Sequence, residues 1–208
     1  VMIGLMSGMF LSALDQTVVS TSMRTIADDL NGMSLQAWVT TAYMIMSTIS
    51  TPLYGKLSDI FGRRPLFIIA ISVFVIGSLL AGTADSMYQL AGYRAIQGLG
   101  AGGLMALPLA IMGDMLAPRE RAKYQGFFLA VFGVSSVIGP LIGGLLSGTP
   151  EILGITGWRW VFLINVPIGI VALAIVLKAL HLPKTHHRVR IDWWGAATVI
   201  TATVPLLV

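Results

Sequence analysis

Long stretches without any charged residue constrain this sequence more than any other feature. Asp, Glu, Lys and Arg are missing from residues 38–54, 66–84, 95–113, 124–150, 160–177 and 193–208. Most of these stretches have the roughly 17–25 residues that a helix needs to cross a bilayer, whereas a soluble helix of that length shows a charged face. Only 11% of the 208 residues are charged, against about a quarter in soluble domains. The sequence therefore predicts an all-α polytopic membrane protein.

Seven apolar segments are expected, near residues 1–23, 38–57, 66–84, 88–113, 123–147, 159–180 and 193–208. Residues 1–23 lack the basic start of a signal peptide and contain an acid, so we interpret them as a span. We expect three regions: a six-helix bundle over 1–180, a basic linker over 181–192, and the start of a seventh helix over 193–208. Because the outermost segments are open-ended, we expect the sequence to be a piece of a longer protein.

The basic residues of the loops indicate an orientation. With the N-terminus inside, the outer loops hold only Arg24 and Arg159, and Arg94 lies within a span. The other ten fall in inner loops: Lys56, Arg63, Arg64, Arg119, Arg121, Lys123, Lys178, Lys184, Arg188 and Arg190. Short inner loops carry such an excess of Lys and Arg. We therefore expect a multi-pass protein of the cell (inner or plasma) membrane with a cytoplasmic N-terminus, and we attribute the net charge of +4 to the membrane rather than to nucleic acid.

Two ionisable residues, Asp15 and Arg94, lie inside predicted spans, where each costs roughly 2.5–3.5 kcal/mol on insertion scales. Counted from the outer ends of their segments, their depths are ~12 and ~9 Å at 1.5 Å per residue. They can therefore share one layer of a central cavity. Each lies on a stripe of small and polar residues, which either lines water or receives a neighbouring helix; the stripes are Gly8, Ser12, Asp15 and Ser22, and Arg94, Gln97, Gly98 and Ala101.

A carboxylate placed in this way is suited to proton exchange. Burial disfavours its charged form, whereas a nearby guanidinium favours that form. Asp15 can then load and release a proton as access switches sides, and a cationic substrate can take the neutralising role of the proton. The alternative is a structural ion pair, or separate pairings with backbone carbonyls.

The loop over residues 55–65, GKLSDIFGRRP, joins the second and third segments. It resembles the G-x-L-a-D-r-x-G-R-k/R signature of the major facilitator superfamily, at the expected topological position. The matching residues are Gly55, Asp59, Gly62, Arg63 and Arg64.

Further motifs resemble those of the 14-helix drug:proton antiporters of this superfamily. They are LDQTVV at 14–19, RAIQGLGA at 94–101, GVSSVIGPLIGG at 133–144, WRWVFLINVPIG at 158–169 and DWWG at 192–195. One departure is Ser20-Thr21-Ser22, where the family often has Asn-Val-Ala, which places cavity polarity and substrate range in doubt. The resemblance implies two inverted three-helix repeats in the first bundle and a second bundle against which it rocks, driven by the proton gradient without a cofactor.

The 55–65 loop is interpreted as a cytoplasmic gate. Gly55 is expected to allow close helix contact, and Gly62 to permit a sharp turn. Asp114 is the best candidate partner for Arg63 and Arg64, and such a cluster can latch the outward-facing state. The resemblance implies that this gate also contacts the second bundle. The alternative is that these charges only enforce topology.

In the fifth segment, small residues allow backbones to approach closely, and a proline bends the helix. The residues concerned are Gly133, Gly139, Pro140, Gly143 and Gly144. Spacing alone fits ordinary packing in any membrane bundle; it is the family resemblance that associates the motif with antiport.

These features favour an antiporter that exports small hydrophobic or cationic compounds in exchange for protons, with Asp15, Arg94 and Gln97 as coupling residues. A second hypothesis is a transporter of the same fold for a specific metabolite, lipid or siderophore. A membrane enzyme or scaffold is a third, and it is disfavoured because no catalytic set or phosphate loop is found. The adjacent His186 and His187 make a weak metal site, so we expect no metal.

Overall fold

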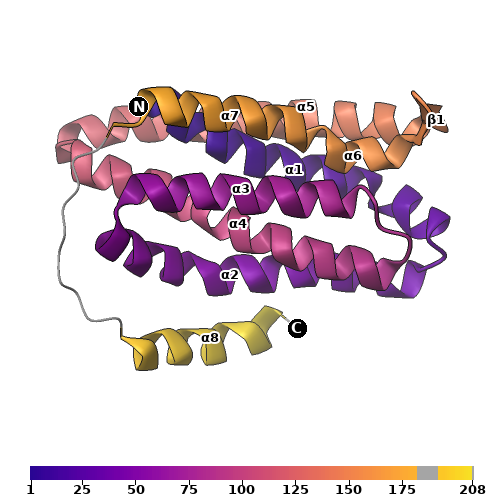
Figure 1. Ribbon diagram of the computed structural model, residues 1–208, viewed down its shortest axis with the longest axis horizontal. Coiled ribbons are helices and arrows are strands. Elements are labelled where there is room, and N and C mark those ends of the chain that lie inside the picture. The colour runs from indigo at the N-terminus through magenta and orange to yellow at the C-terminus, as the bar shows by residue number, and fades with distance from the viewer. Residues whose placement is uncertain (182–191, 208) are drawn as a thin grey trace.

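The computed structural model describes residues 1–181 and 192–207 and is almost entirely helical there (Figure 1). Its long helices run side by side as one bundle. The helices are α1 (Met2–Asp29), α2 (Gln36–Phe61), α3 (Arg63–Ala81), α4 (Met87–Met115), α5 (Pro118–Gly148), α6 (Trp160–Leu163), α7 (Asn165–Ala179) and α8 (Trp193–Leu207). Single 3-10 turns precede α2 (Met33–Leu35) and α6 (Gly157–Arg159).

The helical segments are long and apolar enough to span a membrane. Among the described residues, four single helices and the combined segment Gly157–Ala179 have the length and composition of spans. The sixth long helix, α2, is not among them. This architecture confirms the predicted all-α polytopic membrane fold. Helices α1 and α5 extend beyond their predicted ends, to Asp29 and back to Pro118, because polar ends continue helices outside the apolar core.

The sixth span, Gly157–Ala179, departs from a regular helix only locally. Ile164, between α6 and α7, keeps helical angles (φ −62°, ψ −25°), and its N–H donates to the Trp160 carbonyl at 2.9 Å. Pro167 lies just beyond it and has no N–H to donate to the carbonyl of Leu163, which weakens the helix at this point. A second departure is a short antiparallel hairpin between β1 (Glu151–Ile152) and β2 (Ile155–Thr156).

Helix α4 lies between α2 and α3, and its start is fixed locally. The Ser86 hydroxyl accepts a hydrogen bond from the Gln89 N–H at 3.2 Å, and the Gln89 side chain accepts one from the Asp85 N–H at 3.0 Å. This reciprocal cap defines where the helix begins. Further along, a Cβ on Gly98 would lie 2.5 Å from the Tyr43 carbonyl of α2, and one on Gly100 would lie 2.5 Å from the Phe74 nitrogen of α3. The glycines therefore bring α4 into backbone contact with both neighbours.

The interior consists of two apolar clusters stacked along the bundle. One contains Leu11, Phe74 and Ala101, and the other contains Leu14, Ala81 and Leu90. On α3 and α4, Ser78, Arg94 and Gln97 fall in sequence between the contributions to the two clusters, and on α1 the buried Asp15 directly follows Leu14, the first residue of the second cluster. With Asn165 of α7, they form what we call the polar layer, which divides the apolar core at mid-bundle.

The yellow helix α8 lies along the outer side of α2 (Figure 1), and none of its described residues is fully buried. The predicted linker over 181–192 falls, apart from its end residues, outside the described part of the chain. The predicted domain boundaries and the inverted repeat stay predictions.

Candidate functional site

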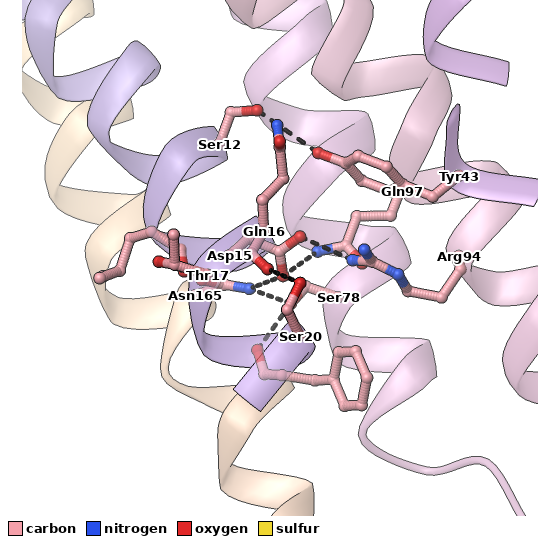
Figure 2. A network of polar contacts seen from close by, with 12 residues as sticks. Ser12, Asp15, Gln16, Thr17, Ser20, Tyr43, Ser78, Arg94, Gln97 and Asn165 are labelled. Carbon is pink, nitrogen blue, oxygen red and sulfur yellow. Dashed lines mark hydrogen bonds and ion pairs between the residues drawn. The ribbon is translucent and has the colours of Figure 1, made fainter. Parts of the chain in front are cut away.

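Asp15 lies at the centre of the polar layer (Figure 2). Its Oδ2 accepts a hydrogen bond from Arg94 Nη1 at 2.6 Å, within an ion pair. Its Oδ1 accepts two more, from Gln97 Nε2 at 3.0 Å and Asn165 Nδ2 at 2.8 Å. Three charge-assisted hydrogen bonds stabilise the carboxylate in the interior of the bundle. The structure thus brings together Asp15, Arg94 and Gln97.

Arg94 is held on several sides. Its guanidinium carbon lies 4.0 Å from the centre of the Tyr43 ring and 6.0 Å from that of Phe162, distances at which aromatic rings attract a cation. Its Nη1 also donates to Gln97 Oε1 at 2.8 Å. Because this bond occupies the amide oxygen of Gln97, the amide nitrogen is turned toward Asp15.

Asn165 and Ser78 complete the layer, and the sequence analysis did not select either. Asn165 Nδ2 donates to Ser78 Oγ at 3.0 Å as well as to Asp15, and Ser78 Oγ donates to the Phe162 carbonyl at 2.6 Å. Placing a neutral polar side chain in a membrane span costs less free energy than placing a charged one. The insertion cost alone therefore does not single out Asn165 or Ser78. The available signal was the position of Asn165 inside the WRWVFLINVPIG motif, two residues before a helix-weakening proline.

Asp15 has no exposed surface, and Arg94 is 3% exposed. The expectation of a water-accessible pocket around Asp15 is therefore not met in this structure. All members of both predicted stripes are buried, so these faces receive neighbouring helices rather than water. Polar residues do reach the surface one position away, where Gln16, Ser20 and Thr21 are exposed on α1.

The loop cluster forms around Arg63. Its guanidinium pairs with Asp59 at 2.9 Å and with Asp114, at the end of α4, also at 2.9 Å, and it donates to the Ser58 hydroxyl. Arg64 does not join Asp114; its Nη2 donates to the carbonyl of Leu177, near the end of α7, at 2.9 Å. The side chain of Asp114 is 55% exposed, and ion pairs so exposed contribute at most about 1 kcal/mol. This cluster is easily broken.

The two glycines of the loop differ in role. Gly62 is the only residue between α2 and α3 and has φ of 98° and ψ of 153°, a conformation that is practically restricted to glycine. At Gly55 an added Cβ would meet no described atom within 4 Å. The interpretation of Gly55 as a close-contact position is therefore wrong for the described residues; its carbonyl instead accepts a hydrogen bond from Arg63 at 3.4 Å.

The glycines of α5 fall into two groups. A Cβ on Gly139 would lie 2.5 Å from Thr17 Cβ, and one on Gly143 would lie 2.8 Å from the Val18 carbonyl, so both face α1. At Gly133 and Gly144 an added Cβ would meet no described atom within 4 Å. Pro140 is also exposed. One edge of α5 thus packs inside the bundle, and the other is open.

The fold and the buried ion pair define a polytopic helical membrane protein of the kind that includes transporters. The chain belongs to the Major Facilitator Superfamily, whose family model matches residues 5–207. This family membership confirms the predicted superfamily and the prediction that the protein is not an enzyme.

Two curated relatives come from Bacillus subtilis (strain 168). "Multidrug resistance protein 3" is 42% identical over 207 residues, which is 100% of this chain and 39% of that protein. "Multidrug transporter protein MdtP" is 40% identical over 204 residues, 98% of this chain and 37% of that protein. The chain thus spans less than half the length of these relatives.

Solved structures support the fold. The crystal structure of a D-xylose-proton symporter matches with a TM-score of 0.75 at 17% identity, over 99% of this chain and 51% of that one. The human organic anion transporter MFSD10 matches with a TM-score of 0.73 at 19% identity, over 99% of this chain and 54% of that one. At these identities the likeness concerns the fold.

Proposed function

We propose that this chain is the N-terminal bundle of an efflux transporter of the cell membrane, which expels small hydrophobic or cationic compounds in exchange for protons. The observation that carries the proposal is the Asp15–Arg94 ion pair, buried at mid-bundle, in a chain whose relatives include proteins named for multidrug resistance and transport. In this proposal the proton gradient drives export, and no cofactor takes part.

The coupling step follows from charge balance in the polar layer. While Asp15 is charged, it neutralises Arg94 across a 2.6 Å contact. A proton on Asp15 cancels that negative charge and leaves Arg94 as the uncompensated cation, which disfavours a cationic substrate nearby. Loss of the proton removes this repulsion. Because Asp15 has no exposed surface, proton transfer requires that the surrounding helices first separate and admit water.

In this proposal the transported compound binds at the exposed polar face of α1. Gln16, Ser20 and Thr21 are exposed there, immediately beside Asp15 in the chain, and a polar face is costly against lipid. In the proposal this face opens to a cavity shared with a second bundle. The exposed hydroxyls donate to their own helix, Ser20 to the Gln16 carbonyl at 2.7 Å and Thr21 to the Thr17 carbonyl at 3.0 Å, so they present oxygen lone pairs to a cation.

The Arg63 cluster is proposed as the cytoplasmic gate. It ties α2 to α4 through Asp59 and Asp114, and its weak, exposed ion pairs can break and reform within a transport cycle. Arg64 attaches α3 to α7 separately. Motion at this end of the bundle therefore involves the helices that also carry Arg94 and Asn165.

The test uses the full-length transporter that contains this chain, reconstituted in vesicles. Ethidium is added, and the proton release that it drives is followed with a pH-sensitive dye. Asp15→Asn removes the titratable group, and we expect proton release to fall at least about ten-fold, the loss that corresponds to 1.4 kcal/mol of coupling. Asp28→Asn, at an exposed position near the end of the same helix, is the matched control and should behave as wild type. Wild-type exchange in the Asp15 variant rejects the proposal.

A further inference from the structure

The surface that α3 and α7 share is apolar along most of its length. The two helices pack against each other (Figure 1). From Pro65 to Leu79 of α3 and from Pro167 to Leu177 of α7, every exposed side chain is apolar. The exposed face of α1, by contrast, carries polar side chains. A wholly apolar face suits hydrocarbon, so we assign the α3–α7 surface to lipid.

A groove of about 260 Å³ lies between the two helices on this surface. Its apolar lining consists of Ile71, Val75 and Ile76 of α3 and Gly169, Ile170 and Leu173 of α7. Gly169 lets the helices approach here, because a Cβ on it would clash with the Val75 side chain. Ser72 also lines the groove, but its hydroxyl donates to the Ile68 carbonyl of its own helix at 2.8 Å. The groove therefore suits methylene groups rather than a polar ligand.

Two basic residues lie at one end of the same surface, near the Gly62 turn and on the proposed cytoplasmic side. Arg64 is in the first turn of α3, and its Nη2 donates to the carbonyl of Leu177 in α7 at 2.9 Å. Lys178 is the next residue of α7 and is exposed. Neither basic residue takes part in any of the ion pairs that the described residues form. Two positive charges therefore lie close together without a described carboxylate to neutralise them.

The depths of the charges and of the groove match the layout of a phospholipid. Helix α3 has 19 residues and is about 28 Å long, close to the ~30 Å of a hydrocarbon core, so Arg64 lies at headgroup level. On α3, Arg64, Ile71 and Val75 recur at helical intervals and share one stripe. The rise from Arg64 to Ile71 is about 10 Å, and that from Lys178 to Leu173 is about 8 Å. The groove thus begins where an acyl chain continues below its headgroup.

We propose that this surface binds one anionic phospholipid, whose phosphate contacts Arg64 and Lys178 and whose acyl chain fills the groove. The groove alone selects no lipid, because all lipid tails are as apolar as its lining, although a tail that fills it gains dispersion contacts. Selection comes from the two cations, since basic pockets between membrane helices attract anionic headgroups. The proposal is independent of proton-coupled efflux.

The test uses the full-length transporter that contains this chain, in a mild detergent. Phosphatidylglycerol and phosphatidylcholine with identical acyl chains are titrated separately, and native mass spectrometry gives the Kd of each. Each basic group near the membrane surface contributes about a five-fold preference for negative charge. The double variant Arg64→Gln/Lys178→Gln should therefore raise the Kd of phosphatidylglycerol about 25-fold and leave that of phosphatidylcholine unchanged.

A second double variant is the matched control for charge. Arg119→Gln/Lys123→Gln also removes two positive charges, from exposed positions at the start of α5, and should keep the wild-type Kd of phosphatidylglycerol. Equal weakening by both double variants overturns the proposal, because it indicates general attraction to a basic surface, and so does no weakening by the first. The exposed Lys178→Gln alone should raise the Kd about five-fold, which serves if the Arg64 variant does not fold.

A further pair of variants tests the groove. Ser72→Phe places a ring in it and leaves both cations, so the Kd of phosphatidylglycerol should rise several-fold. Ser136→Phe is the control, because Ser136 is exposed on α5 and its hydroxyl likewise donates within its own helix, to Phe132 at 2.8 Å. Glycerophosphoglycerol, the headgroup without acyl chains, should not compete. Competition by it, or a wild-type Kd in Ser72→Phe, overturns the proposal in favour of a simple anion site. Because binding is measured without substrate or a proton gradient, failure here is distinct from failure of the proposed exchange.

Discussion

At the scale of single residues, Asp15 and Arg94 are the described charges that lie wholly inside the bundle, at 0% and 3% exposure. Removing one member of a buried pair leaves the other charge uncompensated, which costs about 3–5 kcal/mol in proteins. Three hydrogen-bond donors to one carboxylate keep the pair in a single geometry. The layer is therefore a structural element of the core.

Glycines set how closely α4 approaches its neighbours, and one of them gives a residue-scale prediction. A Cβ at Gly100 would lie 2.5 Å from the Phe74 nitrogen and 2.6 Å from the Ala70 carbonyl, and neither backbone atom can move alone. We expect Gly100→Ala to destabilise the protein by about 1–3 kcal/mol. Gly92→Ala, also on α4 but with open space around its Cβ, should be neutral or stabilise by up to about 1 kcal/mol.

Thermal unfolding in detergent, followed by tryptophan fluorescence, measures both variants. Equal midpoints for Gly100→Ala and Gly92→Ala would contradict the close packing of α4 against α3.

At the scale of elements, the joint between α2 and α3 consists of one residue. Gly62 turns the chain with φ of 98°, and Arg63 follows at once to pair with Asp59 and Asp114. The turn at Gly62 and the ion pairs of Arg63 therefore depend on each other, because the direction of α3 sets the position of the Arg63 guanidinium.

We expect Gly62→Ala to cost about 1–3 kcal/mol through backbone strain and to displace Arg63 from its partners. In the full-length transporter this variant should lower both the unfolding midpoint and the rate of ethidium export. Gly113→Ala, in the last turn of α4 with no described atom near its Cβ, is the control and should retain both. A Gly62→Ala protein with wild-type stability would show that the observed turn conformation is not required.

The sequence predicted the elements well where cost or composition decided them. Five of the six long helical segments follow from uncharged runs, and the Asp15–Arg94 contact follows from the free-energy cost of burying two charges. The roles of Asn165 and Ser78 depend on which helix faces meet, and no local pattern encodes this. Nor does the motif tell a close-contact glycine from an open one, because no described atom lies within 4 Å of a Cβ placed on Gly55.

At the scale of the whole molecule, α5 has one face that no described residue covers. Exposed apolar side chains along it include Leu129, Val137, Leu141 and Leu145. Gly133 and Gly144 are open on the same helix, whereas Gly139 and Gly143 pack on α1. The inner edge of α5 therefore packs against α1, and its outer face is left to contact lipid or the proposed second bundle.

Leucine substitutions test that division in the full-length transporter. Gly143→Leu should destabilise the protein by about 1–3 kcal/mol, because its side chain meets the Val18 carbonyl. Gly144→Leu should leave the unfolding midpoint nearly unchanged and yet reduce ethidium export several-fold, if that face slides against a second bundle. Unfolding curves and vesicle transport are compared for each protein. Wild-type export by Gly144→Leu would assign the open face to lipid.

The contact between α1 and α5 has a mechanical consequence. Thr17 donates to the Ser135 carbonyl at 3.1 Å, and Ser22 donates to the Gly143 carbonyl at 3.1 Å. These two hydrogen bonds, about one and a half turns apart along α1, hold the helices together. The Thr17 bond lies two residues from Asp15. A force that tilts α5 from outside the bundle is therefore transmitted through the Thr17 hydrogen bond to α1, two residues from Asp15. Pressure on the outer surface of α5 thus strains the hydrogen bonds of the buried carboxylate.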